Sequence, residues 1–242
     1  MGRLARAELE SLLRTRKLDG TLTSAHPLVD PSARADDTVG TGVAALDRRL
    51  GGGVPRGELS SLSGPPSSGR TSLVCGWLAA VTRRGELAAL IDARDTFDPE
   101  SAAASGVVFS RLLWVRGGPV TSAASTVSTV ERQVDRAVKA LNLVLQAGGF
   151  GLVVLEMADV APALVRGLPW TTWLRLARVL EGSRTACVLV GAQPIARSPG
   201  GISILLEAGR SVSRWSGASD RARLFRGFDL QPRVVSARQA VA

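Results

Sequence analysis

The chain has 242 residues, enough for one sizeable hydrophobic core or for one core with a small appendage. Apolar residues make up 45% and charged residues 21%, as in ordinary soluble globular proteins, and no apolar run is long enough to span a membrane. The net charge of +9 favours an anionic partner such as nucleic acid, although the arginine-rich usage of a GC-rich genome also produces such an excess.

Residues 1–38 are predicted to form an arm that precedes the main domain. Leucines and alanines recur at helical spacing between Leu4 and Arg16, which predicts a short amphipathic helix. A polar linker follows, and its His26, the sole histidine, is expected to be a bystander. The single apolar stripe needs a surface to pack on, either on the chain's own domain or on a partner, including another copy of the chain.

Residues 39–242 are predicted to form one α/β domain that begins with a short helix, with Thr41 as its N-cap. The elements expected next, in chain order, are a strand over 57–62, a helix over 71–83, a strand over 87–92, a helix over 97–105, a strand over 112–115, a helix over 121–147, a strand over 152–156, a helix over 170–180 and a strand over 186–190. This alternation predicts a mainly parallel sheet with helices on both faces. Segments 202–213 and 223–235 look like strands without intervening helices, so we expect antiparallel additions at one edge.

Several side chains are expected in the core because they lie within apolar runs. Cys75 and Cys187 are predicted to be buried, reduced thiols, which favours a cytoplasmic location. One histidine and no paired cysteines exclude the usual zinc patterns. Trp77 and Trp114 are also predicted core residues, whereas Trp170 and Trp173 fit either the core or a partner contact.

A glycine-bounded loop between the strand over 57–62 and the helix over 71–83 has the context of a phosphate-binding loop. Glycines let the backbone N–H groups point inward, and the N-terminus of the helix adds positive potential. ATP or ADP is the expected ligand, with Thr71 placed to hold its magnesium. The residues predicted to contact it are Gly64, Ser67, Ser68, Gly69, Arg70, Thr71 and Ser72.

Arg70 breaks the usual G-x-x-x-x-G-K-[ST] pattern, which has lysine at this position. A lysine ammonium is a compact charge that reaches between phosphates, whereas arginine is a broad planar fork. Arg70 can pair with phosphate, but not in the same place relative to magnesium. A loop that serves only as a β-to-α turn, without ATP turnover, is the competing interpretation.

The order of the motifs resembles the RecA family of recombinases from about residue 39 onward. Several separated stretches carry the resemblance, at nearly the family's spacing: Thr41–Asp47, Gly51–Gly57, Gly64–Gly69, Ile91–Pro99 and Gly191–Pro194. The resemblance implies a RecA-type P-loop fold. It further implies that Gln193 corresponds to the glutamine that senses the γ-phosphate.

Departures from the family pattern concentrate where the resemblance places the chemistry. Arg94 stands where the recombinases have the glutamate that activates water, and an arginine cannot accept a proton at neutral pH. Glu156 stands where an aspartate orders magnesium, so Thr71 and Glu156 are the candidate magnesium ligands. The segments after Glu156 and Gln193 are shorter than the two DNA-binding loops of recombinases. These departures argue against ATP-driven strand exchange.

Among RecA-like proteins, the sequence is most similar to the ImuA-type accessory proteins of damage-induced mutagenesis, and residues 12–20 also resemble the opening of that group. The resemblance implies an adaptor without enzyme activity of its own that contacts a Y-family polymerase homologue, an error-prone replicative polymerase or the RecA filament. It implies weak or indirect DNA binding. Two alternatives remain: an active DNA-dependent ATPase that uses another carboxylate such as Asp95, and a nucleotide-independent nucleic-acid binder.

Overall fold

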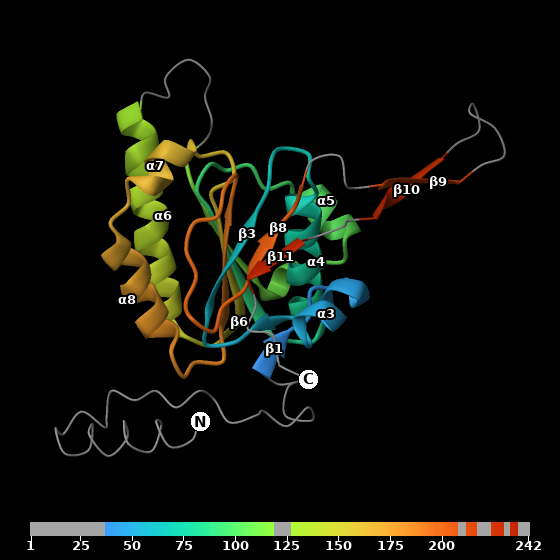
Figure 1. Ribbon diagram of the computed structural model, residues 1–242, viewed down its shortest axis with the longest axis horizontal. Coiled ribbons are helices and arrows are strands. Elements are labelled where there is room, and N and C mark those ends of the chain that lie inside the picture. Colours follow the sequence, from blue (N-terminus) through green and yellow to red (C-terminus); the bar gives the residue numbers. More distant parts are fainter. Residues whose placement is uncertain (1–36, 119–126, 208–211, 217–223, 230–232, 237–242) are drawn as a thin grey trace, which may run out of the picture. The chain divides into compact units, whose positions relative to one another are not determined.

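The computed structural model describes residues 37–118, 127–207, 212–216, 224–229 and 233–236 (Figure 1). The predicted arm helix and His26 lie outside these residues, and the division of the chain at residue 38 stays a prediction. In the described part, no helix combines the length and apolarity that a membrane span requires.

The centre of the described fold is a seven-stranded sheet whose neighbouring strands run parallel, except for β11 at one edge. In spatial order its strands are β11 (Arg233–Ser236), β8 (Ser203–Leu205), β3 (Leu59–Ser63), β7 (Ala186–Gly191), β6 (Phe150–Glu156), β4 (Leu87–Asp92) and β5 (Leu112–Arg116). Ser63 lies opposite Gly191, and Asp92 lies opposite Glu156. The carboxyl ends of these strands therefore form one continuous edge.

The C-terminal strands correct part of the sequence prediction. Each of the segments 202–213 and 223–235 contains parts of two strands, and β8 runs parallel to β3 where an antiparallel strand was expected. The reason is that Ser198 N donates to Leu59 O (2.9 Å), so the chain has already returned to the amino end of β3 before β8 begins. β11 is antiparallel to β8, as expected for an edge addition. β9 (Val212–Ser216) and β10 (Leu224–Asp229) pair with each other in a separate antiparallel sheet.

Helices cover both faces of the sheet (Figure 1). One face carries α4 (Arg70–Arg83) and α5 (Pro99–Ala104), whose buried side chains pack in one core cluster with the strands. The other face carries α6 (Val127–Ala147) and α8 (Trp170–Leu180) over a second cluster. The fold class predicted from the sequence, an α/β domain with a mainly parallel sheet, is confirmed.

Helix boundaries differ from the prediction where polar side chains set them. The expected helix over 97–105 is the shorter α5, because the Asp98 carboxylate accepts the N–H groups of Glu100 and Ser101 and Pro99 follows at the first helical position. The predicted N-cap Thr41 is wrong. Val43 precedes α3 (Ala44–Leu50), and Thr41 instead donates its backbone N–H to Asp47 (2.7 Å). α7 (Pro162–Arg166) was not predicted.

Most of the side chains expected in the core are buried. Cys75 and Cys187 are buried free thiols, and burial raises the pKa of both. Trp77 is fully buried, whereas Trp114 is half-buried and packs edge-on against Phe97, with Arg116 over its ring. Of the pair left open by the sequence, Trp173 is buried and Trp170 is 59% exposed.

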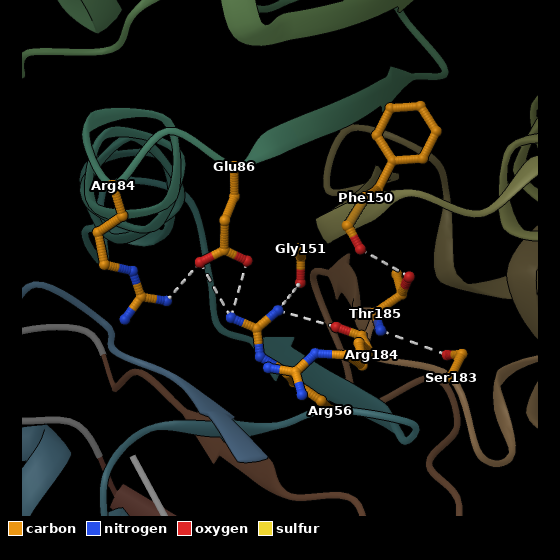
Figure 2. A network of polar contacts seen from close by, with 8 residues as sticks. All are labelled: Arg56, Arg84, Glu86, Phe150, Gly151, Ser183, Arg184 and Thr185. Carbon is orange, nitrogen blue, oxygen red and sulfur yellow. Dashed lines mark hydrogen bonds and ion pairs between the residues drawn. The ribbon is translucent and has the colours of Figure 1, made fainter. Parts of the chain in front are cut away.

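A buried arginine holds the amino ends of the strands together (Figure 2). Arg56, which precedes β3, pairs with Glu86 at the start of β4 (2.8 Å). Its Nη1 also donates to the backbone oxygens of Arg184, before β7, and of Gly151, in β6. One guanidinium thus connects four strands at the end of the sheet opposite the phosphate loop.

Two short strands complete the described elements, with β1 (Thr38–Val39) antiparallel to β2 (Val54–Pro55). A single turn of 3-10 helix, Phe109–Arg111, leads into β5.

Candidate phosphate-binding site

The predicted phosphate loop connects β3 to α4 at the carboxyl edge of the sheet. Ser67 (φ 60°) and Gly69 (φ 93°) have left-handed backbone conformations, which are costly for a residue other than glycine. A Cβ at Gly64 would lie 2.5 Å from Leu206 O and 2.7 Å from Ser68 Oγ, so that position admits only glycine. The loop is therefore tightly folded against the sheet, as a phosphate-binding nest requires.

Two buried polar atoms in the loop have no hydrogen-bond partner among the described residues: Ser68 Oγ and Arg70 Nη1. Arg70 is the first residue of α4 and is buried, while Thr71 and Ser72 behind it are exposed. Leaving a cationic donor buried without an acceptor is costly. An oxyanion at the N-terminus of α4 would accept from both atoms, so these residues fit the phosphate of a nucleotide.

Glu156 ends β6 beside the loop, and it is electrostatically coupled to Arg70. Burial raises the pKa of Glu156 to about 7, against the lowering effects of the Ala158 N–H (2.8 Å) and of Arg70. The structure therefore brings together the loop, Arg70 and Glu156. The described residues include no cluster of three or more His, Cys, Asp or Glu side chains, so a magnesium ion would depend on Thr71, Glu156 and the nucleotide's own oxygens.

Arg94 follows β4 and is held against α6. Its Nη1 donates to Gln133 Oε1 (2.7 Å), and the Arg94 side chain is buried. The Asp92 carboxylate receives the N–H groups of Arg94 (3.3 Å) and Phe97 (2.8 Å), which fixes the turn after the strand. Arg94 is thus a structural side chain at the position of the expected base.

Asp95, the alternative carboxylate considered for an ATPase, is engaged elsewhere. Both of its oxygens accept from Arg116 at the end of β5, each at 2.8 Å. This bidentate contact holds the pKa of Asp95 below its ordinary value. A carboxylate in that state is a weak proton acceptor.

Gln193, the candidate γ-phosphate sensor, lies exposed just after β7. Its Oε1 accepts from Arg166 Nη1 of α7 (3.0 Å). Sequence reasoning missed Arg166 because α7 is too short to give a periodic signal. It also missed Asp92, although a carboxylate that ends an apolar run at the edge of a parallel sheet was a usable signal. Gln133 was missed because its partner, Arg94, is remote in the sequence.

The family to which the chain belongs follows from comparison with known proteins. Residues 21–156, more than half of the chain, match the family model described as the RecA N-terminal domain. The chain belongs to the RecA family. The match includes the phosphate loop, Arg94 and Glu156, whereas Gln193 and α7 lie beyond it.

Individual RecA relatives match over a shorter stretch. Protein RecA of Synechococcus sp. (strain WH7803) is 44% identical over 86 residues, which cover 36% of this chain and 22% of that protein. Protein RecA of Nostoc punctiforme is 42% identical over 86 residues, which cover 36% of this chain and 24% of the relative. The chain thus matches less than a quarter of the length of these curated RecA proteins.

Proposed function

We propose that this RecA-family protein is an adaptor of the ImuA type in bacterial DNA-damage tolerance, which works through protein contacts and holds nucleotide without turning it over. The observation that carries the proposal is the Arg94–Gln133 hydrogen bond. It replaces a general base with a cation tied to a helix. Removing a positioned general base typically costs about 10²–10⁴ in rate.

The other carboxylates near the carboxyl edge offer no substitute base. Asp92 receives two backbone N–H groups, and Asp95 is paired with Arg116. Glu156, with a pKa of about 7, is partly protonated at neutral pH and is also the candidate magnesium ligand. Bound magnesium would neutralise phosphate charge. The residues of this chain then bind the nucleotide: Arg70 and Ser68 hold phosphate oxygens, and Gln193, which accepts a hydrogen bond from Arg166, follows β7 at the same edge of the sheet.

The proposed partners are a Y-family polymerase homologue, an error-prone replicative polymerase or the RecA filament. The ImuA-type resemblance supports them, together with an arm that needs a packing surface. DNA contact in this proposal is weak or indirect, and the arm offers a route to oligomers.

Truncation of residues before Asp30 tests the adaptor role. The shortened chain should lose co-purification with the purified polymerase partners while its thermal unfolding remains cooperative. Partner binding that survives the truncation would contradict the proposed role of the arm. Loss of binding accompanied by loss of cooperative unfolding calls for the milder Leu12→Asp variant, which should also lose binding.

An active DNA-dependent ATPase is the second candidate, favoured by the RecA relatives and by the well-formed phosphate loop. The two proposals differ in wild-type turnover. If the adaptor proposal holds, ATPase activity with single-stranded DNA stays at background for the wild type and for Arg70→Lys, because the base is still missing. Turnover above background in the wild type, or a sharp rise in Arg70→Lys, would favour the ATPase.

A further inference from the structure

A cleft of about 310 Å³ lies at the carboxyl ends of β6 and β7, on the side of α7 and α8. We call it the α7–α8 cleft. Its lining includes the side chains of Met157, Val160, Val165, Trp173 and Ile195, all of them apolar. Gln193, the candidate γ-phosphate sensor, also lines the cleft, and Trp173 is one of the two tryptophans for which the sequence left a partner contact open. All of these residues lie beyond the stretch that matches the RecA N-terminal domain.

The rim of the α7–α8 cleft carries one large exposed aromatic side chain. Trp170 lines the cleft at the start of α8 and is 59% exposed, and Leu174, one turn further along, is exposed as well. Exposed large apolar side chains beside an apolar hollow are typical of protein interaction sites. Trp173, three residues further along the same helix, also lines the cleft, but it is buried and anchors α8 to the core.

The stretch around the cleft carries three exposed arginines and is flanked by the exposed carboxylates of Asp159 and Glu181. From Val160 to Leu180 the chain has no acidic residue but contains Arg166, Arg175 and Arg178, all exposed. Arg166 lines the cleft and donates to Gln193. Within the part of the chain that the structure describes, its guanidinium forms no ion pair, so its charge is available to a ligand.

We propose that the α7–α8 cleft docks an acidic peptide segment of a partner protein. One large aliphatic or aromatic side chain of the peptide enters the apolar cleft beside Trp170, and a flanking carboxylate pairs with Arg166 at its rim. The proposal rests on the proposed adaptor function, for which it supplies a second contact surface besides the arm.

A peptide suits this surface better than a single-stranded nucleic acid does. Nucleic acids also meet arginines and aromatic rings, but they need flat aromatic faces on which successive bases stack. Here one of the two tryptophans is buried, and the hollow is lined by methionine and branched aliphatic side chains. Such a lining accepts a compact apolar side chain.

Fluorescence anisotropy with a labelled synthetic peptide tests the proposal on the full chain. The probe is a twelve-residue peptide with a central Leu-Phe pair flanked by aspartates, compared with a version that has lysines for the aspartates and one that has serines for Leu-Phe. The wild type should bind the acidic apolar probe saturably, more weakly at high salt, and neither control peptide. Trp170→Ala and Arg166→Ala should each weaken binding about 10-fold or more, and Arg166→Lys should recover part of it.

Matched control variants lie on exposed positions away from the cleft. Leu143→Ala on α6 and Arg48→Ala on α3 should leave peptide affinity unchanged. Failure of the wild type to bind the acidic probe, or equal affinity in the cleft variants and the controls, would overturn the proposal. Displacement of the probe by a fifteen-nucleotide oligothymidine whose own affinity falls in Trp170→Ala would assign the cleft to nucleic acid instead.

The two functional proposals fail separately. The peptide assay contains no polymerase, so peptide binding without polymerase binding would overturn the adaptor assignment and keep the cleft. If no peptide binds, and Trp170→Ala and Arg166→Ala leave polymerase binding intact, the adaptor assignment is kept and the cleft proposal is overturned.

Discussion

Arg94 Nη1 and Gln133 Oε1 form a 2.7 Å hydrogen bond between the end of β4 and α6. The bond turns the Arg94 side chain toward α6, whereas Glu156, at the end of the neighbouring strand, is coupled to Arg70 of the phosphate loop. Because Arg94 Nε is also buried without a partner, Gln133 provides the hydrogen-bond acceptor for a largely desolvated cation. A side chain in this position stabilises the fold and takes no proton.

Removal of the Gln133 acceptor should therefore destabilise the protein. We expect Gln133→Ala to lower the free energy of unfolding by about 1–3 kcal/mol, the usual cost of an unsatisfied buried donor. Urea unfolding followed by circular dichroism measures it. Gln146→Ala, at an exposed position of the same helix, is the matched control and should change stability by less than about 0.5 kcal/mol. Equal effects of the two variants would show that the Arg94–Gln133 bond contributes nothing.

Arg70 should decide whether the loop binds nucleotide. Thermal unfolding in millimolar Mg-ATP or Mg-ADP should shift upward, because a site occupied at about 100 times its dissociation constant gains roughly 2.7 kcal/mol. Arg70→Met keeps an apolar stem but removes the cation, and it should abolish the shift. Inorganic phosphate alone, used as a second probe, should give a smaller shift that also depends on Arg70.

The nucleotide experiment has a matched control on another helix. Arg48→Met replaces an exposed arginine of α3 and should retain the full shift. A wild-type protein without any shift would mean that the loop is an inherited turn, and the proposed nucleotide binding would then be wrong.

Much of the sheet could be predicted from the sequence because apolar runs and glycine-bounded turns are local signals. The runs that became β4 and α8 gave those elements with the bounds seen in the structure. The pairing of β8 could not be predicted, since it depends on where Ser198 meets Leu59 in space. The N-cap assigned to Thr41 failed because Asp47, six residues away, accepts its N–H.

The candidate site could likewise be predicted only in part. The position of Gly64–Gly69 before a helix follows from spacing, so the loop could be found in the sequence. The contacts that determine its chemistry join distant segments: Arg94 with Gln133, Asp95 with Arg116, and Gln193 with Arg166. Such pairs depend on tertiary packing, and no local pattern predicts them.

Arg56 should be a larger contributor to stability than its exposed neighbour Arg84, although both pair with Glu86 (Figure 2). The Arg56 side chain is 8% exposed and the Arg84 side chain 46% exposed. Because the Glu86 side chain is 31% exposed, loss of the Arg56 pair should cost less than the about 3–5 kcal/mol of a fully buried pair but more than the about 0–1 kcal/mol of an exposed one. Urea unfolding of Arg56→Ala and Arg84→Ala compares them directly, and equal losses would contradict the role assigned to Arg56.

Glu156 should make the protein less stable as the pH rises toward neutrality. Its pKa is about 7 in the folded chain and 4.5 as an ordinary glutamate, so between these values the folded state binds more protons than the unfolded state. The free energy of unfolding therefore falls with rising pH across this window. The stability that comes from the protonated Glu156 carboxyl group is fully lost above about pH 7. The difference between the two pKa values corresponds to a change of roughly 3 kcal/mol in the free energy of unfolding. Asp95 and Asp98 have lowered pKa values and act in the opposite sense, but only near and below their ordinary value of 3.8.

Glu156→Gln removes the titration and keeps the shape of the side chain. Urea unfolding at pH 5, 6, 7 and 8 should show a smaller decline for Glu156→Gln than for the wild type, with the variant the more stable protein at pH 8. Glu131→Gln, which neutralises an exposed carboxylate on α6 that does not contribute to the Glu156 shift, should follow the wild-type curve. Parallel curves for Glu156→Gln and the wild type would mean that the carboxylate is hydrated and titrates as an ordinary glutamate in the folded chain.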